Sequence, residues 1–502
     1  MSYGHTINKI KKEKDEKTMK RIIASILLLV VLVTGMLSSL TSCDIIGKKP
    51  GGNQAADFVM PEGGFDTTTP VTIKFYHSMG AALQEILNET IVEFNKIYPN
   101  ITIEHESLGD YDGVRNQIKT EIAVGAQPNL AYCYPDHIAL YNKANAVQTL
   151  DTLINDPTYG FTQEQLDDFI EGYYNEGKSF GDGKMYTLPL SKSTEVLYYN
   201  VEALVAAGVV DADGNAAPPK TWEEMAIACE KLKAWDPNCI PLGYDSESNW
   251  FITMCEQYGS PYTSATGENF LFDNETNRNF VKMFREWYQK KWVTTEELSG
   301  GYTSALFTGE SSNSTDSSVP AGTRCYMCIG STGGATYQQP NMTNGKYEFT
   351  VGITSMPQVD PANPKVISQG PSITIFKKDN PQEVLATWLF AKYLATDVTF
   401  QARVSMNNGY APVIKSVAEN PVYAEFLAKA DTEHIQAYAV KVALEQESAY
   451  YASPAFNGSS VAREQVGLLI QKCFVISGGD IDAQIKKAFE ECIGECKYQS
   501  AQ

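Results

Sequence analysis

The sequence predicts an α/β protein of two or more domains. Residues 71–103 first alternate apolar and polar side chains, then repeat apolar ones at helical spacing, then alternate again. This β-α-β pattern is typical of a parallel or mixed sheet covered by helices. The chain has 502 residues, of which 43% are hydrophobic and 11% aromatic, a composition that disordered chains lack. At roughly 100–200 residues per domain, this length indicates at least two domains.

The individual elements follow from local patterns. Val71, Ile73 and Phe75 mark the first strand, and the helix after it ends before Pro99. A second strand follows at residues 101–103. Further helices are predicted at Thr221–Ala234 with Thr221 as the cap, Asn279–Trp292 and Pro381–Leu394, and strands at Val196–Tyr199, Arg324–Ile329 and Ser372–Phe376. Residues 309–322, rich in Ser and Gly, are predicted to form a loop.

The N-terminus has the pattern of an export signal. Two basic residues after Met19 precede an apolar run, Ile22–Met36, and then small residues. The segment ends in Leu40-Thr41-Ser42-Cys43, which resembles the lipobox of bacterial lipoproteins, where the Cys is lipidated. We therefore expect residues 1–42 to be a signal peptide, with Met19 as an alternative start, and residues 43–70 to be a lipidated Cys and a flexible tether. An uncleaved membrane anchor is the alternative, since about 20 apolar residues span a bilayer. Either way the rest of the chain lies outside the cytoplasm.

The charge excludes some partners. The 60 acidic residues outnumber the 40 Lys and Arg, giving a net charge of −20. Nucleic acid phosphates and anionic membrane surfaces both attract clustered basic residues. We therefore expect no nucleic-acid partner, and a membrane contact only through the N-terminal lipid.

Ten cysteines raise the question of disulfides or metal. Nine lie after Cys43, so at least one of those is unpaired. Cys325-x-x-Cys328 and Cys492-x-x-x-Cys496 have spacings that can hold zinc. In a strand, however, positions 325 and 328 point to opposite faces. The second pair, one helical turn apart, fits a disulfide or two free thiols better. We expect no metal and no cofactor.

No motif predicts an enzyme. Residues 172–179 match the phosphate-loop pattern G-x-x-x-x-G-K-[ST], but no apolar strand precedes them and no helix follows. No G-x-S-x-G elbow occurs. Acidic residues are numerous enough to supply a glycosidase pair, but nothing singles out two of them. The turn at residues 330–334 can bind an anion or a sugar hydroxyl, or be a plain turn. Aromatic residues such as Tyr132, Tyr134 and Tyr410 can stack on sugars or pack in the core.

Several segments together resemble family 1 extracellular solute-binding proteins. Residues 183–200, ending in Tyr198-Tyr199-Asn200, are similar to the family's hinge strand. Residues 218–224 resemble its P-x-T-W-x-E helix start, and residues 408–413 its G-x-x-P turn. The order of these segments holds from about residue 71 to 500.

Within the family, the chain most resembles the glycerol-3-phosphate-binding branch. Carried over residue by residue, the resemblance places ligand contacts at Tyr111, Asp136, Ser193, Trp250, Ser331, Gly370, Tyr410 and Arg463. Asp136 stands where that branch has Glu, residues 80–83 lack its acidic residues, and Lys192 replaces a small polar residue. These departures concern the ligand more than the fold.

The resemblance implies a two-lobed periplasmic-binding-protein-like fold with a hinge and a ligand cleft between lobes. Lobe 1 is expected at 71–188 plus 324–375, and lobe 2 at 189–323 plus 376–502. The implied function is capture of a carbohydrate-type solute (sugar, oligosaccharide or glycerol 3-phosphate) by hinge closure. The chain would be a monomer, lipid-anchored on the extracytoplasmic side of a membrane, that delivers the solute to the permease subunits of an ABC importer without chemistry of its own. The alternatives are an exported glycan-acting hydrolase and a binding module for a sensor.

Overall fold

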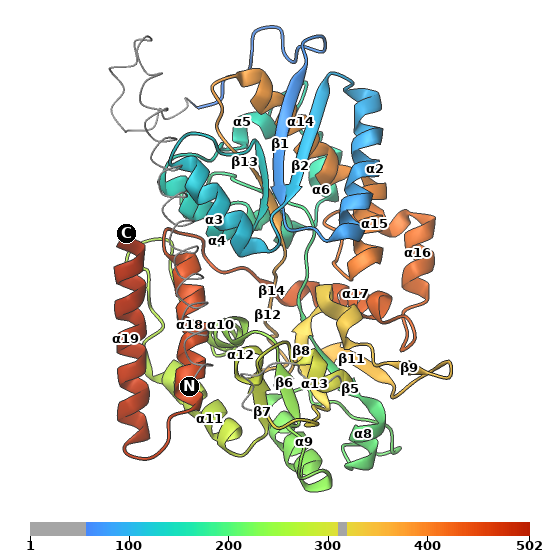
Figure 1. Cartoon of the computed structure of the whole chain (residues 1–502), viewed down its shortest axis with the longest axis vertical. Coiled ribbons are helices and arrows are strands. Elements are labelled where there is room, and N and C mark those ends of the chain that lie inside the picture. The colour runs from blue at the N-terminus through green and yellow to red at the C-terminus, as the bar shows by residue number, and fades with distance from the viewer. Residues whose placement is uncertain (1–56, 310–318, 502) are drawn as a thin grey trace, which may run out of the picture. The chain divides into compact units, whose positions relative to one another are not determined.

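Two mixed β-sheets, each of five strands, form the frame of the chain in the computed structural model, which describes residues 57–309 and 319–501 (Figure 1). The predicted signal peptide, Cys43 and the tether up to residue 56 lie outside the described residues, as does most of the predicted loop at 309–322. Within the described part, no helix is both long and apolar enough to cross a membrane.

The first sheet contains the predicted β-α-β unit. Its strand order is β2 (Ile101–Ser107), β1 (Val71–His77), β3 (Leu130–Cys133), β13 (Ser372–Ile375) and β4 (Leu188–Pro189). β1 runs parallel to β2 and β3, while β13 runs antiparallel to β3 and β4. The prediction of a parallel or mixed sheet is therefore confirmed.

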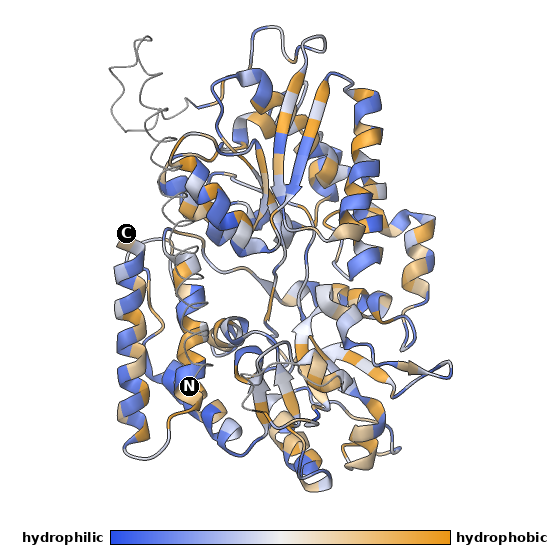
Figure 2. Cartoon of the chain, viewed as in Figure 1, coloured by the Kyte–Doolittle hydropathy of each residue, from blue (hydrophilic) through white to orange (hydrophobic). Residues whose placement is uncertain are grey.

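Helices cover both faces of the first sheet. Ile73 and Phe75 of β1 belong to one apolar cluster with α2 (Ala81–Ile97) and α14 (Pro381–Thr396). Tyr76 of the same strand belongs to another cluster, with α3 (Tyr111–Ile122) and α4 (Pro135–Lys143). Successive strand residues point to opposite faces, so the two clusters lie on the two sides of the sheet. Figure 2 shows apolar and polar residues alternating along β1 and β2.

The second sheet has the order β11 (Val351–Ser355), β5 (Glu195–Asn200), β8 (Met327–Ser331), β6 (Leu242–Tyr244) and β7 (Val293–Thr295). One apolar cluster joins it to α9 (Trp222–Trp235), α10 (Glu247–Gln257), α11 (Glu275–Gln289), α18 (Ser459–Phe474) and α19 (Ile481–Ala501). A second cluster joins it to α13 (Ser304–Thr308), η1 (Thr332–Gln338) and α17 (Ile435–Glu445). Both faces of this sheet are covered as well.

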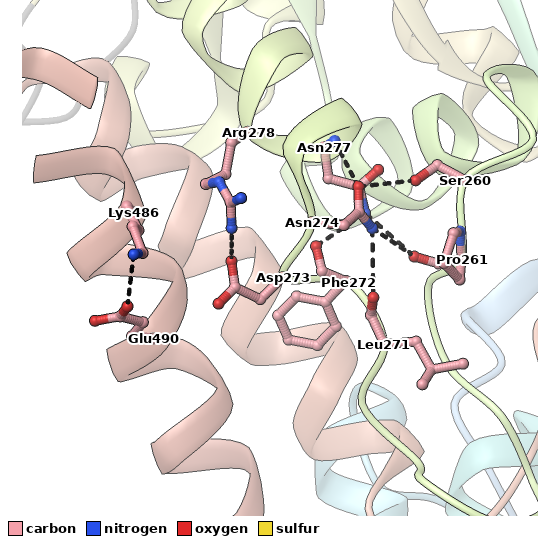
Figure 3. Close-up of polar contacts among 10 residues, drawn as sticks. All are labelled: Ser260, Pro261, Leu271, Phe272, Asp273, Asn274, Asn277, Arg278, Lys486 and Glu490. Carbon is pink, nitrogen blue, oxygen red and sulfur yellow. Dashed lines mark hydrogen bonds and ion pairs between the residues drawn. The ribbon is translucent and has the colours of Figure 1, made fainter. Parts of the chain in front are cut away.

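Side-chain amides fix the loop between α10 and α11. The Asn274 side chain caps α11 by accepting from the Asn277 backbone N–H at 3.0 Å (Figure 3). The buried Asn277 amide in turn donates to the carbonyls of Pro261 at 3.2 Å and Phe272 at 2.9 Å. Arg278 pairs with Asp273 beside it. These bonds tie the loop that follows α10 to the first turn of α11.

Shorter elements complete the described chain. They are α5 (Asp151–Ile154), α6 (Gln163–Asp168), α7 (Glu171–Glu176), α8 (Val201–Ala206), α12 (Glu296–Ser299), α15 (Val398–Asn408), η2 (Lys415–Glu419), α16 (Pro421–Ala428), η3 (Glu447–Ala449), and the strands β9 (Met342–Thr343), β10 (Lys346–Tyr347), β12 (Val366–Ile367) and β14 (Tyr450–Tyr451).

Three segments connect the two sheets. The chain leaves the first sheet after β4 and enters the second at β5, and it returns between β12 and β13. Ser193 on the first connection pairs with Gln369 on the second, through backbone hydrogen bonds of 2.7 and 3.0 Å. The third connection follows α15: Ala411 pairs with Lys192 on the first connection, and the chain then passes through α16 to α17 on the second sheet. Further on, β14 pairs with β12 and leads to α18.

The sheets divide the chain differently from the expected lobe boundaries. Strands β8 and β11, within residues 324–375, pair with β5 in the second sheet, so this range does not belong to lobe 1 as a whole. Helix α14, expected in lobe 2, packs on β1 and β13 of the first sheet. Strand partners far apart in sequence leave no local pattern, and this is why the boundaries were wrong.

The predicted starts of individual helices agree more closely with the structure. Helix α9 begins at Trp222, and the Thr221 side chain accepts from the Glu224 N–H at 3.1 Å, which confirms the predicted cap. Helix α14 begins at Pro381 as predicted, while α11 begins at Glu275, four residues earlier than predicted.

The nine cysteines of the described residues are buried free thiols. Cys325 and Cys328 lie in the same apolar cluster, which corrects the expectation that they face apart. The cause is that β8 begins only at Met327, so strand alternation does not apply at 325. In the described ranges, no group of three or more His, Cys, Asp or Glu side chains is arranged to hold a metal ion.

Candidate functional site

A cavity lies where elements of the two sheets meet. It encloses about 570 Å³ of empty space, part of it open to solvent. Tyr134, Pro135 and Asp136 line it from the end of β3 and the start of α4. The other lining residues come from α7, α10 and the loop after it, β12 and the residues that follow it, the segment between β14 and α18, and α18. They are Glu176, Ile252, Tyr262, Ile367, Ser368, Gln369, Ser453, Pro454, Ala455, Ser459 and Arg463.

Asp136 reaches the cavity from the first turn of α4. Pro135 opens this helix, because its fixed φ suits the first helical position and it has no N–H to leave unpaired. The Asp136 carboxylate accepts from the His137 N–H at 3.0 Å, and the positive end of the helix dipole favours its charge. A half-buried carboxylate is thereby held at the cavity wall.

Arg463 reaches the same cavity from α18, on the side of the second sheet. Its guanidinium donates to the Asn249 side-chain oxygen. The Asn249 amide nitrogen donates in turn to Glu195 Oε1 at 2.9 Å and to Gln369 Oε1 at 2.8 Å. Both ends of the Asn249 amide are therefore occupied, which fixes its orientation and the position of Arg463.

Glu195 lies behind this wall and is almost fully buried. Its Oε2 accepts from the Tyr244 hydroxyl at 2.6 Å. Burial raises the pKa of Glu195 to about 7, against the opposing effects of the hydrogen bonds from Tyr244 and Asn249 and of the Arg463 charge. Glu195 also pairs with Ser331 in the sheet register, which places it beside a predicted site residue.

An ion pair closes another part of the wall. Lys192 donates to the Glu176 carboxylate, and both side chains are buried. The same ammonium donates to Ser372 Oγ at 3.1 Å and to the Gly370 carbonyl at 3.2 Å. All three donors of the ammonium thus have partners, as a buried charge requires.

Tyrosines gather next to the cavity. Tyr134 lines it, and its ring centroid lies 4.4 Å from that of Tyr111. Tyr111 stacks on Tyr132 with centroids 5.7 Å apart and an angle of 15° between the rings. Burial raises the pKa of Tyr410, and Tyr410 also interacts with Tyr111. Tyr111, Tyr132 and Tyr134 each interact electrostatically with Tyr410, which follows α15.

The turn after β8 packs on Tyr410. The Ser331 side chain accepts from the Gly333 N–H at 3.1 Å and caps η1. A Cβ at Gly333 would lie 2.9 Å from the Tyr410 ring, so the backbone approaches the ring closely there. The predicted residues Ser331 and Tyr410 are thus brought together.

Gly370 and Ser193 lie where two connections cross. Gly370 has φ +107°, and a Cβ there would lie 2.6 Å from the Ser191 carbonyl oxygen. Glycine is required by this backbone geometry. Ser193 pairs with Gln369, which lines the cavity, so both predicted residues adjoin it without lining it.

Trp250 does not belong to the site, contrary to the prediction. It is fully buried in the core of the second lobe, stacked on Tyr244 with centroids 4.8 Å apart and close to Phe284. Its neighbour Asn249 bonds instead to Gln369 and Arg463, which line the cavity. The phosphate-loop match at 172–179 is also structural, because residues 171–176 form helix α7 and not a loop.

Three site residues were not predicted from the sequence, namely Glu195, Asn249 and Gln369, whereas Tyr134 was among the aromatic residues named as able to stack on a sugar. Glu195 carried a usable signal, since it is a carboxylate at the start of an otherwise apolar strand run. Asn249 and Gln369 carried none, because amides are frequent on surfaces.

Comparison with known proteins shows similarity to bacterial solute-binding proteins. A family model described as bacterial extracellular solute-binding protein matches residues 89–432. The sn-glycerol-3-phosphate-binding periplasmic protein UgpB of Salmonella typhimurium is 25% identical over 356 residues, which cover 69% of this chain and 75% of that protein.

Solved structures share the architecture. UgpB from Mycobacterium tuberculosis in complex with glycerophosphocholine matches with a TM-score of 0.66 at 16% identity, covering 86% of this chain and 99% of that one. The sugar-binding protein MalE from Xanthomonas citri matches with a TM-score of 0.64 at 18% identity, covering 86% and 98%. These neighbours are two-lobed, and at this identity they show the fold.

Proposed function

The chain belongs to the family of bacterial extracellular solute-binding proteins, the binding components of ABC importers, and we propose that it captures a carbohydrate-type solute in the cavity lined by Asp136 and Arg463. The lobes close on the solute, and the closed complex delivers it to the membrane-spanning subunits of a permease.

The observation that carries this proposal is that a carboxylate and a guanidinium from different lobes line one cavity. Asp136 follows a strand of the first sheet, and Arg463 lies on a helix that covers the second. A solute that contacts both binds the closed arrangement more strongly than the open one. That difference in affinity is what shifts the population to the closed state.

The lining suits a polyhydroxylated solute. The Asp136 carboxylate and the Gln369 side chain supply hydrogen-bond partners for hydroxyl groups, while Tyr134 and Tyr262 offer aromatic faces for the C–H face of a sugar. We propose that Asp136 and Arg463, which line the cavity, contact the solute directly, and that Tyr111, Ser193, Ser331 and Tyr410 beside it complete the site when the lobes close. Gly370 contributes the backbone geometry of the crossing connections.

Glycerol 3-phosphate is the first solute to test. It is the ligand in the name of the 25% identical relative, and Arg463 can pair with a phosphate through two hydrogen bonds. Sugars are the second group, because the cavity combines tyrosines with hydroxyl-binding groups.

The remaining features belong to the same proposal. Cys43 carries the lipid that holds the chain on the extracytoplasmic side of the membrane, and the body acts as a monomer that hydrolyses nothing. The relatives that match are binding proteins, which favours this function over a glycan-acting hydrolase. A sensor role requires a partner other than a permease.

Isothermal titration of the purified full-length chain with sn-glycerol 3-phosphate and with maltose tests the proposal. We expect saturable binding near micromolar Kd, about −8 kcal/mol, for at least one of them. Mass spectrometry after incubation should recover that solute unchanged. Hydrolysis of the solute, or no binding of either these or a panel of oligosaccharides, would contradict the proposal.

A further inference from the structure

Among the described residues that line the cavity, Arg463 is the only one with a basic side chain. Its guanidinium does not end at the cavity wall but is hydrogen-bonded to Asn249, which is bonded to Glu195. One amide therefore separates the cation that faces the solute from a buried carboxylate that does not.

We propose that Glu195 is a specificity-determining residue of this site: the presence or absence of its negative charge behind Asn249 decides whether Arg463 admits an anionic solute. This inference rests on the proposed function, and it concerns the charge of the solute that the site accepts. Glu195 does not line the cavity, so it acts through Arg463 and Asn249.

The charges near the cavity show why protonation of Glu195 affects the binding of an anion. The Glu176–Lys192 pair is neutral as a unit. With Glu195 ionised, Arg463 faces two carboxylates, Asp136 and Glu195, and these three groups together carry one negative charge; Asp245, which also acts on Glu195, adds to it when ionised. With Glu195 protonated, Arg463 and Asp136 balance. An anion is therefore repelled by the first state and tolerated by the second, whereas a neutral sugar is affected little.

The geometry allows this proton to come and go without rearrangement. The Tyr244 hydroxyl donates to Glu195 when the carboxylate is ionised, and a hydroxyl can rotate to accept when it is protonated. Asn249 keeps its second acceptor, Gln369, in either state. A change of charge at constant shape is what distinguishes a specificity role from a structural one.

The groups that act on Glu195 come from several elements. They are Tyr244 and Asp245 at the end of β6, Asn249 on α10, Tyr451 on β14 and Arg463 on α18. Burial outweighs the hydrogen bonds and the Arg463 charge, and it raises the pKa of Glu195 to about 7. The charge thus changes within the range of external pH that an exported protein meets.

Sulfate is the probe, because it is a tetrahedral oxyanion that does not itself titrate between pH 5.5 and 8.5. Isothermal titration at constant ionic strength should show sulfate affinity of the full-length chain falling by about tenfold or more across this range, since one charge at this separation has an effect of that order. Maltose, as the neutral probe, should show no such dependence.

Substitutions test whether Glu195 is the group whose charge changes the sulfate affinity with pH. Glu195→Gln should lose most of the pH dependence of sulfate affinity, and the part that remains is that of Asp245, whose pKa burial raises to about 6. Glu247→Gln is the matched control, because Glu247 is a buried carboxylate on α10 whose Oε1 accepts from the Glu297 N–H and not from Asn249. This control should keep the wild-type profile.

Tyr244→Phe is the second variant, in case Glu195→Gln does not fold. Loss of the hydroxyl removes a hydrogen bond that favours the ionised carboxylate, so the midpoint of the sulfate profile should move to higher pH. A flat wild-type profile, an unchanged profile in Glu195→Gln, or no sulfate binding at pH 5.5 would overturn the inference. Sugar or glycerol 3-phosphate binding alongside a flat sulfate profile would leave the proposed function intact.

Discussion

The ammonium of Lys192 contacts the carboxylate of Glu176, and the ion pair joins the connection between the sheets to helix α7 at the cavity wall. The exposed fractions of the two side chains are 0% and 5%. Lys192 also bonds to the Gly370 carbonyl on the second connection, so one buried cation links three segments.

Removing one partner of this ion pair should lower the free energy of unfolding. Lys192→Met leaves the Glu176 carboxylate buried without its cation, and we expect the free energy of unfolding to fall by about 3–5 kcal/mol. Urea denaturation measures this change. Lys429→Met is the control, since Lys429 pairs with Glu425 on the surface, and it should change stability little. Equal effects of the two substitutions would contradict the role assigned to Lys192.

Stability should depend on pH through Glu195. In the unfolded chain its pKa is near 4.5, and in the fold it is about 7, so the folded state holds the proton over this interval while the unfolded state releases it. The free energy of unfolding therefore falls as pH rises from 4.5 to 7, by up to about 3 kcal/mol, and the loss stays constant above that.

Glu195→Gln should lack this part of the pH dependence. Urea titrations at pH 5 and pH 8 measure it as the difference between wild type and variant at each pH. The variant should gain stability relative to the wild type at pH 8. The same difference at both pH values would show that Glu195 does not titrate in this interval.

Gly370→Ala should destabilise the crossing of the connections. Its φ of +107° is unfavourable for alanine, and the new Cβ would lie 2.6 Å from a backbone oxygen. We expect a loss of about 2–4 kcal/mol, seen as a lower melting temperature. Gly208→Ala is the control, with φ +75° and open space at its Cβ, and it should cost only about 1 kcal/mol.

A substitution at Trp250 should lower stability and leave solute binding unchanged, whereas a substitution at Tyr134 should weaken solute binding. Trp250→Phe removes part of a fully buried side chain and should lower the free energy of unfolding by roughly 2 kcal/mol, with the solute Kd unchanged. Tyr134→Ala should weaken solute binding about tenfold, because Tyr134 lines the cavity. Denaturation and calorimetry on both variants check this. A large loss of solute affinity in Trp250→Phe would show that Trp250 belongs to the binding site.

The elements that the sequence predicted correctly are those whose signal is local. The strand at Val71, the helix after it and the Thr221 cap depend on neighbours within a few residues. The lobe boundaries depend on partners far apart, such as β8 with β5, and periodicity contains no information about such pairing.

The site divides in the same way. Family resemblance supplied Asp136 and Arg463, which line the cavity, but it also supplied Trp250, which is core. Asn249 and Gln369 could not have been found from sequence, because their importance comes from the partners that the fold gives them. Glu195 could have been singled out from the sequence, because a carboxylate at the start of an apolar strand is unusual, but its partners are known only from the structure.

We propose that Arg463 and the cavity it lines bind the solute. Isothermal titration of Arg463→Ala with whichever solute binds the wild type tests it most directly, with Arg403→Ala as control because Arg403 pairs with Glu89 and lies outside the cavity. We expect Arg463→Ala to weaken binding at least about 30-fold, or about 2 kcal/mol, and Arg403→Ala to retain the wild-type Kd. Wild-type affinity in Arg463→Ala would contradict it.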